Sequence, residues 1–444
     1  MTHTKTGPFF FILTLTFTLV SLGSSVSQAD VPNPEELSRR IDLLAGELET
    51  LRLGEVAAKA DQKQFGLGPA ASKVYRNKQG VSIGGYGELV YQNFNSKRDS
   101  GAEVTPQDQI NFQRLVMYFG YKFSDKLILN TELEFEHASS AGNRAGQNGS
   151  WGLEFAYIDY QWDPRLSLRA GNLLVPMGWI NELHEPTVFL GVRRPDVEQT
   201  ILPSTWRENG VGIYGDWQSL TYRSYLLNGF DAGSCRANSC GNGGFDASGI
   251  RGGRQNGSRA LSEDLAWVSR VDWTPVAGAT LGGSYYRGDA GQDQTTESIP
   301  DLPIQIAELH FEYRLKGWEL RGLGASTWIQ NAAELNAARD PVLTGASSIG
   351  SRQYGFYGQL GRTFGVESGS PWIKTPFVRY EQWDTQAQVP SGYARDPGRQ
   401  QRSLTLGVQF KTQDQLVLTA EFQNFANAAN TGLDQVNLGM GFIF

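Results

Sequence analysis

Charged side chains that could act together gather in one stretch of the chain, residues 172–214. This stretch interrupts a long series of alternating patterns, and insertions of that length inside a compact β domain are usually functional. Fixed charges in a narrow aqueous passage select solutes by electrostatics, so ion selection is the chemistry to expect. We predict that residues 174–207 form the third external loop of a β-barrel and fold inward to narrow its passage. The charged residues assigned to this constriction are Arg193, Arg194, Arg207, Glu182, Glu185, Asp196 and Glu198.

The remaining reactive side chains form no recognisable site. Cys235 and Cys240 lie in a segment rich in Gly and Asn, and an even pair in an exported chain favours a disulfide over free thiols or a metal site. His137, His184 and His310 are scattered without paired metal-ligand spacing. His184 could lie near the constriction, although a polar loop residue is the simpler interpretation. No G-x-S-x-G motif or catalytic Ser-His pairing stands out, so we predict no enzyme activity, no metal and no cofactor.

The composition fits one large β structure. The 444 residues include 52 Gly, 17 Tyr and 11 Trp and carry a formal net charge of −7. Many glycine and aromatic residues with modest charge suit a large barrel better than several small domains. The acidic balance and the lack of a basic patch argue against nucleic acid as a partner.

Residues 1–29 have the features of an export signal. Lys5 supplies a positive start, residues 9–20 an apolar run, and residues 27–29 a small-x-small cleavage site. A retained membrane helix fits less well, because the apolar run is short and broken by threonines. No other apolar segment is long enough to cross a bilayer as a helix, so a membrane role requires strands.

Residues 30–55 predict a short helix unlike everything after them. Asn33 can cap this helix, Pro34 fits its first position, and Glu36 can reach back to the cap. Two interpretations stay open: an amphipathic helix lying on its own domain, or a short periplasmic coiled coil between subunits, which is compatible with a trimer. Residues 56–80 are predicted to be a linker. The apolar positions of the helix follow heptad spacing: Leu37, Ile41, Leu44, Leu48 and Leu51.

Apolar and polar residues alternate with period two from residue 81 to residue 444, the pattern of half-buried strands. About sixteen such segments occur, an even number, as in bacterial single-chain barrels. We predict an all-β, transmembrane antiparallel β-barrel over 81–444, in the bacterial outer membrane with lipid and lipopolysaccharide around it. The predicted strands are 81–94, 108–123, 126–137, 151–162, 165–173, 208–216, 218–229, 263–273, 277–289, 303–315, 318–329, 352–364, 372–384, 402–411, 415–425 and 433–444.

Short and long connections alternate between these strands. An outer-membrane barrel has this asymmetry, with short periplasmic turns and long external loops, whereas a soluble sandwich or propeller does not. The longer polar loops are 95–107, 138–150, 174–207, 230–262, 290–302, 330–351, 385–401 and 426–432. Tryptophans expected to form an aromatic girdle lie beside the tight turns: Trp162, Trp217, Trp273, Trp318 and Trp372.

Residue parity separates lipid-facing positions from interior ones. In the second predicted strand Met117 and Phe119 share one face, while Arg114 and Tyr118 share the other. Apolar residues are expected to face lipid, and charges a wet interior. The sign of the charges at the narrow part decides selectivity, and this mixed lining does not select a sign. The basic candidates for the lining are Arg114, Arg169, Arg223, Arg270 and Arg314, and the acidic ones are Glu132, Glu134, Glu136, Glu308 and Glu312.

Several stretches of the β region resemble one known family, the phosphate-selective porins O and P. They are RLVMYFGYKF (114–123), AGNLLVPMG (170–178), FLGVRRPDVEQTILPSTWRENGVGIYG (189–215) and the ending GMGFIF. The resemblance implies a trimeric, sixteen-stranded channel with its third external loop folded inward, and an anion or phosphate preference. Known members line the pore with an arginine ladder and a lysine cluster. In this sequence the adjacent Arg193 and Arg194 are the best anion-attracting candidates, with Asp196 and Glu198 able to neutralise them.

Two hypotheses from different classes follow. The first is a porin for passive diffusion of small hydrophilic solutes or ions, with an anion or phosphate preference as its finer form. The second is a structural anchor or adhesin without an open channel, in which the helix before the barrel acts as a periplasmic tether. Bilayer conductance separates them, because only the first requires current.

Overall fold

The computed structural model describes residues 38–42, 64–138, 149–236, 239–240, 243–294, 297–339, 342–365 and 372–444. The chain divides into two compact units, 1–55 and 56–444. In the first unit, residues 38–42 are helical and exposed, while the predicted export signal and the rest of the predicted helix lie outside the described residues. Within the part of the chain that is described, no helix is long and apolar enough to cross a membrane.

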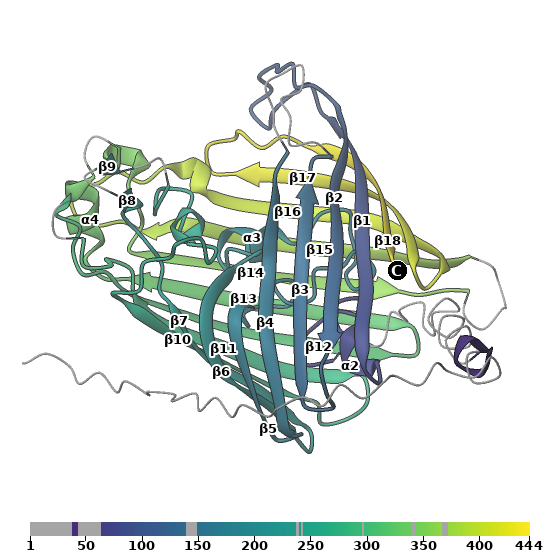
Figure 1. Ribbon diagram of the computed structural model, residues 1–444. Helices are drawn as coiled ribbons and strands as arrows, with labels where there is room; N and C mark the ends of the chain where they lie inside the picture. Colours follow the sequence, from purple (N-terminus) through teal and green to yellow (C-terminus); the bar gives the residue numbers. More distant parts are fainter. Residues whose placement is uncertain are drawn as a thin grey trace, which may run out of the picture. The chain divides into compact units, whose positions relative to one another are not determined.

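The second unit is a closed antiparallel β-barrel (Figure 1). Sixteen strands of the described residues form it, and β1 closes on β18 with Tyr86 opposite Ile443. The prediction of an all-β barrel of about sixteen strands is therefore confirmed. The barrel strands are β1 (Gly80–Phe94), β2 (Gln109–Lys122), β3 (Leu127–Glu136), β4 (Trp151–Asp163), β5 (Leu166–Leu174), β6 (Arg207–Trp217), β7 (Leu220–Asn228), β10 (Leu265–Trp273), β11 (Ala279–Asp289), β12 (Pro303–Leu315), β13 (Trp318–Ile329), β14 (Arg352–Arg362), β15 (Ile373–Gln388), β16 (Gln400–Gln413), β17 (Leu416–Asn427) and β18 (Gln435–Ile443).

The other regular elements are short and lie in the connections. A two-stranded sheet, β8 (Cys235–Arg236) with β9 (Ser239–Cys240), lies in the loop after β7. Its register sets Cys235 opposite Cys240, but their side chains are outside the described part, so the disulfide stays a prediction. The helical elements are α2 (Lys73–Arg76), α3 (Asp196–Thr200), η1 (Arg251–Gly253), α4 (Ala332–Ala338), η3 (Gly345–Ser347) and η4 (Pro397–Arg399).

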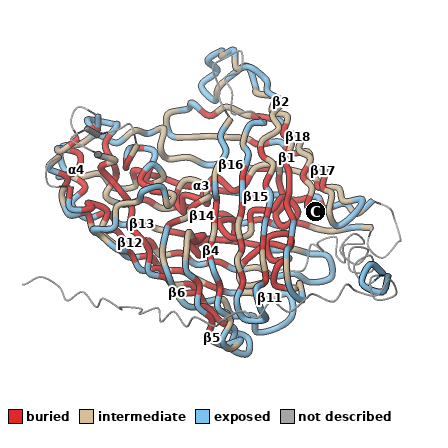
Figure 2. Tube along the Cα trace, viewed as in Figure 1, coloured by how far each residue is buried: buried red, intermediate tan, exposed pale blue. Residues whose placement is uncertain are grey.

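The outer surface of the barrel is apolar, and the alternation within each strand produces it. On β3, Leu133 and Phe135 are 37% and 43% exposed, whereas Glu132 and Glu134 are 0% and 8% exposed and face inward. Exposed residues elsewhere concentrate in the turns and outer loops (Figure 2). The tryptophans predicted beside the tight turns are 43% to 64% exposed: Trp162, Trp217, Trp273, Trp318 and Trp372. An apolar flank with aromatic residues at its edge is the surface of an outer-membrane barrel.

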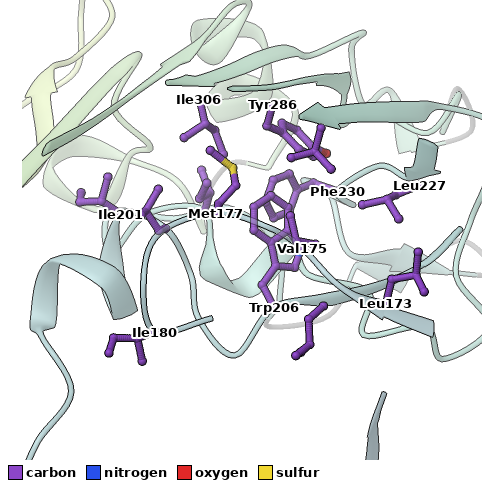
Figure 3. Close-up of a cluster of buried hydrophobic side chains, with 14 of the residues drawn as sticks. Leu173, Val175, Met177, Ile180, Ile201, Trp206, Leu227, Phe230, Tyr286 and Ile306 are labelled. Carbon is purple, nitrogen blue, oxygen red and sulfur yellow. The ribbon is translucent and has the colours of Figure 1, made fainter. Parts of the chain in front are cut away.

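Part of the interior is apolar, which the strand patterns do not predict. The indole of Trp206 stacks on Phe230 with ring centroids 4.6 Å apart and lies 5.1 Å from the ring of Tyr286. Val175 and Met177 join the same cluster (Figure 3). The expectation of a wet interior is wrong at this place, because the loops that fold inward carry apolar side chains of their own.

Phe230→Ala should lower the free energy of unfolding by roughly 3–5 kcal/mol, because it opens a cavity in a closely packed cluster. Phe230 is fully buried, whereas Phe364, which follows β14, is 53% exposed. Phe364→Ala is therefore the control and should cost less than about 1 kcal/mol. Urea unfolding in detergent, followed by tryptophan fluorescence, measures both. Equal losses of unfolding free energy in the two variants would show that the interior cluster contributes no more to stability than an exposed side chain does.

Residues 64–76, the inner segment, lie inside the barrel rather than in a linker. Ala71 accepts a hydrogen bond on its carbonyl oxygen from Asn130 Nδ2 of β3 at 2.9 Å, and the Tyr75 hydroxyl donates to Asp159 of β4 at 2.5 Å. The linker prediction is wrong for this segment, because a judgement from Gly, Pro and polar content overlooked its apolar residues. The apolar side chains buried there are Leu67, Ala70, Ala71, Val74 and Tyr75.

Candidate functional site

The connection between β5 and β6, residues 175–206, crosses the interior of the barrel and is called the inserted loop below. It includes α3 and is largely buried. On one side His184 meets Glu132 of β3, and on the other Glu198 accepts a hydrogen bond from the Tyr357 hydroxyl of β14 at 2.7 Å. The loop therefore spans from one wall of the barrel to the opposite one.

Basic side chains of β13, β15 and β16, on the wall opposite β3, donate hydrogen bonds to the backbone of the inserted loop. Arg379 donates to two loop carbonyl oxygens at 3.1 and 3.2 Å, Arg321 to one at 3.3 Å, and Lys411 to one at 3.1 Å. All four acceptors lie in residues 187–193. These cations anchor the loop, so much of their hydrogen-bonding capacity is used by protein rather than by solute.

Carboxylates on the same wall accept from the loop. Glu421 accepts from the backbone N–H of Val192 at 2.8 Å, and Glu381 accepts from that of Val197 at 3.1 Å. Glu381 also lies 2.8 Å from Arg379, and both side chains are fully buried. The loop thus rests on a charge-paired surface in which each side chain also binds backbone.

The predicted constriction residues Glu182 and Glu198 are buried and paired. Glu182 lies 3.5 Å from Arg223 and 3.8 Å from Arg270, and Glu198 accepts from the N–H of Ile180 at 2.7 Å. Burial raises the pKa of Glu182, while the two guanidiniums oppose that rise. These carboxylates lie within the loop's own packing and not on an open pore surface.

Glu185 joins the inserted loop to the inner segment. Its carboxylate accepts hydrogen bonds from the backbone N–H groups of Ala70 at 3.0 Å and Ala71 at 2.9 Å. Burial raises the pKa of Glu185, and those two N–H groups oppose the rise. The inner segment and the inserted loop therefore form one connected body inside the barrel.

The remaining predicted constriction residues differ in exposure. Arg193 pairs with Asp196 at 3.3 Å, and its side chain is 33% exposed. Arg194 is buried and donates to a loop carbonyl oxygen at 3.3 Å, while Arg207 lies 3.8 Å from Glu154 of β4. Of the adjacent arginines Arg193 and Arg194, only the first presents its charge to open space.

The predicted lining residues face inward but are neutralised by neighbours. Arg114 lies between Glu88 at 2.9 Å and Glu134 at 3.1 Å. Arg169 pairs with Asp159 at 2.8 Å, and both are nearly or fully buried. Asp159 occupies an inward position of β4, so strand parity was a signal that could have found it.

Asp272 is a second partner that the sequence analysis missed. It lies 2.6 Å from Arg223 and 2.8 Å from Arg270, on an inward position of β10. Glu136, at the end of β3, instead accepts a hydrogen bond from the Ser150 hydroxyl at 2.7 Å near the long-loop end. The predicted arginines therefore do not form an uncompensated ladder.

Two cavities with charged residues in their linings lie at opposite ends of the barrel on the side of β13 to β16. The cavity near the short turns has a volume of about 370 Å³, and the one near the long loops about 330 Å³. Residues 187–190 of the inserted loop border the first cavity, and residues 196, 199 and 200 border the second. The first is lined by charged residues including Arg314, Lys316, Glu319 and Lys411, and the second by Asp196, Arg251 and Arg399.

One known protein of similar length is related to this chain in sequence. The chain is 37% identical over 376 residues to an uncharacterized protein of Aquifex aeolicus (strain VF5), covering 84% of this chain and 82% of that relative. The chain belongs to the family of that protein. No model of a known protein family matches it.

Solved structures show where the fold recurs. OmpF of Salmonella typhi, in a complex with daunomycin, superposes with a TM-score of 0.53 at 11% identity, over 83% of this chain and 98% of that one. An anion-selective porin from Comamonas acidovorans gives a TM-score of 0.49 at 13% identity, over 82% of this chain and 99% of that one. The likeness to OmpF shows that this chain has the barrel fold of outer-membrane porins; it does not single out the phosphate-selective porins.

Proposed function

We propose that the protein is an outer-membrane channel for passive diffusion of small hydrophilic solutes or ions. The observation that carries the proposal is the pair of cavities with charged residues in their linings on either side of the inserted loop, inside a closed barrel with an apolar outer surface. Solutes would pass from one cavity to the other, and the inserted loop between the two cavities would limit their size. The proposal assigns no reaction and no energy source to the chain.

We further propose a weak preference for anions, phosphate included. The charged residues that border the cavities are mainly basic. Some of the basic residues are compensated, as Arg314 is by Glu312 at 3.0 Å and by Glu319 at 3.2 Å. Mixed charge tunes selectivity without fixing it, so the preference should be modest.

Single-channel recording in a planar bilayer tests the channel, and reversal potentials in a KCl gradient test its sign. Lys316→Glu should shift the reversal potential toward cation preference, because Lys316 borders the cavity near the short turns. Lys126→Glu is the matched control, since Lys126 is exposed in another short turn of the same rim and borders neither cavity. Equal shifts in both variants would contradict a passage through this cavity. Addition of phosphate should reduce the chloride current if phosphate competes for the path.

The proposal also covers residues 1–55, which precede the barrel, and the oligomeric state of the protein. We propose that residues 1–29 direct export, that residues 30–55 form a periplasmic helix, and that the barrels associate as homotrimers in a membrane of lipid and lipopolysaccharide. The heptad spacing and the resemblance to trimeric porins support this arrangement. Sedimentation of the detergent-solubilised protein, with and without residues 30–55, measures the assembly and the contribution of the helix.

A closed anchor is the second candidate, and one observation favours it. The interior holds an apolar cluster and a buried inner segment, both of which restrict water. An anchor would conduct no current in its wild-type form. The channel hypothesis expects the opposite result.

A further inference from the structure

Three side chains that can bind metal meet inside the barrel from separate segments: Glu132 of β3, Glu154 of β4 and His184 of the inserted loop. All three are buried, and one ligand atom from each lies within 4.8 Å of the others. His184 Nε2 is 3.1 Å from a Glu132 oxygen and 3.9 Å from a Glu154 oxygen. Two carboxylates and one imidazole therefore share a small volume away from water.

Three oxygen atoms of the two carboxyl groups, which hydrogen-bond to each other, have no further donor within the described part of the chain. They are Oε1 and Oε2 of Glu154 and Oε2 of Glu132, on residues that are 0% exposed. The guanidinium of Arg207 is 3.8 Å from Glu154 Oε1, which is too far for a hydrogen bond. A buried carboxylate without donors is strongly unfavourable, so a cation or a proton has to compensate it.

His184 has the orientation of a metal ligand. Its Nδ1 lies 3.0 Å from the backbone carbonyl oxygen of Asn181, which can only accept, so Nδ1 carries the proton. A hydrogen bond of this kind fixes the tautomer of most ligating histidines and leaves Nε2 free to bind. In the neutral ring, Nε2 presents a lone pair to the Glu132 oxygen, and two acceptors 3.1 Å apart require something positive between them.

A β-bulge turns Glu154 toward this point. The register between β3 and β4 pairs Glu132 with Phe155 but Leu133 with Leu153, which leaves Glu154 as an extra residue. Glu154 and Phe155 are consequently both buried, although neighbours on a regular strand face opposite sides. Bulges frequently re-aim a side chain toward a functional site.

Two guanidiniums near the cluster, those of Arg114 and Arg194, are engaged elsewhere, while that of Arg207 lies 3.8 Å from Glu154. Arg114 lies between Glu88 and Glu134, at 2.9 and 3.1 Å. Arg194 donates to the backbone carbonyl oxygen of His184. Neither guanidinium forms an ion pair with Glu132 or Glu154 among the ion pairs of the described residues. Among the ion pairs of the described residues, the two carboxylates therefore face one guanidinium, that of Arg207 at 3.8 Å, and one negative charge is left without a guanidinium.

We propose that Glu132, Glu154 and His184 bind a divalent transition-metal ion, with Zn²⁺ the best fit. Zn²⁺ accepts imidazole nitrogen and carboxylate oxygen at about 2.0–2.2 Å in a tetrahedral arrangement, and Mn²⁺ accepts the same donors. Three protein ligands leave one position for water. The ion would fasten the inserted loop to β3 and β4, whether or not the barrel conducts.

The buried position dictates how the site would be loaded. Because all three ligands are buried, the ion has to bind as the inserted loop docks during folding. Wild-type protein refolded from urea with Zn²⁺, then dialysed, should retain about one ion per chain, as measured by inductively coupled plasma mass spectrometry. EDTA should remove the ion rapidly from unfolded chains and slowly from folded ones.

Variants and spectroscopy test the ligand set. His184→Gln and Glu154→Gln should each weaken Zn²⁺ binding by at least about tenfold, whereas His137→Gln, at an exposed histidine, should not. Heat-modifiable migration in gels reports folding of each variant. If the ligand variants fail to fold, X-ray absorption on the wild-type protein decides, since the proposal requires one imidazole with oxygen ligands. Equal metal content in the His137 and His184 variants, or no retained Zn²⁺ or Mn²⁺ in the wild-type protein, would overturn the proposal in favour of a bound proton.

Discussion

Removal of the inner segment, residues 64–76, is expected to raise the single-channel conductance severalfold. The segment occupies the interior beside the first strands of the barrel, where Tyr75 is hydrogen-bonded to Asp159 and Ala71 to Asn130. The current through a narrow passage grows with its open cross-section, so emptying this part of the interior should widen the conducting path. Planar-bilayer recording of the deletion variant beside the wild-type protein measures the change.

The matched control keeps the length of the chain and removes only the contacts. Replacement of residues 64–76 by a Gly/Ser sequence of equal length should give frequent transitions between wild-type and high conductance, since a flexible segment can enter and leave the interior. Heat-modifiable gel migration confirms that each barrel has formed. If both variants fold and insert but carry no current, the anchor hypothesis replaces the channel hypothesis.

The second large effect is expected from Arg379→Gln, which should destabilise the barrel and release the inserted loop from its wall. Arg379 donates to the carbonyl oxygens of Leu190 and Arg193 and pairs with Glu381 at 2.8 Å, with both charged groups fully buried. Loss of one partner leaves the other charge unpaired, which typically costs about 3–5 kcal/mol. A shift of the urea midpoint and larger, noisier single-channel currents are the expected results.

The double variant Arg379→Gln/Glu381→Gln separates charge from geometry. If the unpaired Glu381 charge causes the loss, the double variant should recover much of the stability, because a neutral amide pair needs no counter-charge. Its currents should stay noisy, because Arg379 reaches Leu190 and Arg193 from two separate nitrogens, whereas the shorter Gln side chain has both of its N–H donors on one nitrogen. Arg402→Gln, at an exposed position of β16, is the control and should change stability by less than about 0.5 kcal/mol. Full stability in the single Arg379 variant would show that this contact does not hold the loop.

The strands of the barrel could be predicted because their signal is local. Residues 126–137 were expected as a strand and β3 covers Leu127–Glu136, since lipid outside and protein inside impose a period of two on each strand. The same parity indicates that Arg169 and Arg223 point inward. It does not indicate what they touch, because Asp159 and Asp272 come from other strands.

The interior contacts could not be predicted, because they join segments distant in sequence. Arg379 and Leu190 are 189 residues apart, and no local pattern relates them. Glu154 is not among the predicted lining residues for a different reason, since the bulge reverses the strand parity by which an inward position is recognised. The linker prediction fails for the inner segment because amino-acid composition does not indicate that Val74 and Tyr75 are buried against the barrel strands. Charge selectivity is the property hardest to predict from the sequence, because it depends on which interior charges remain uncompensated.

The long separations inside the barrel also constrain the order in which it can be assembled. The inserted loop leaves the ribosome and crosses the inner membrane well before Arg379, Glu381 and Glu421, on which it later rests. Until those strands arrive, its backbone and carboxylates lack their final partners, and the early strands expose apolar flanks to water. A half-exported chain is therefore at risk of aggregation. It has to be held unfolded until the carboxyl-terminal strand is available to seal the wall.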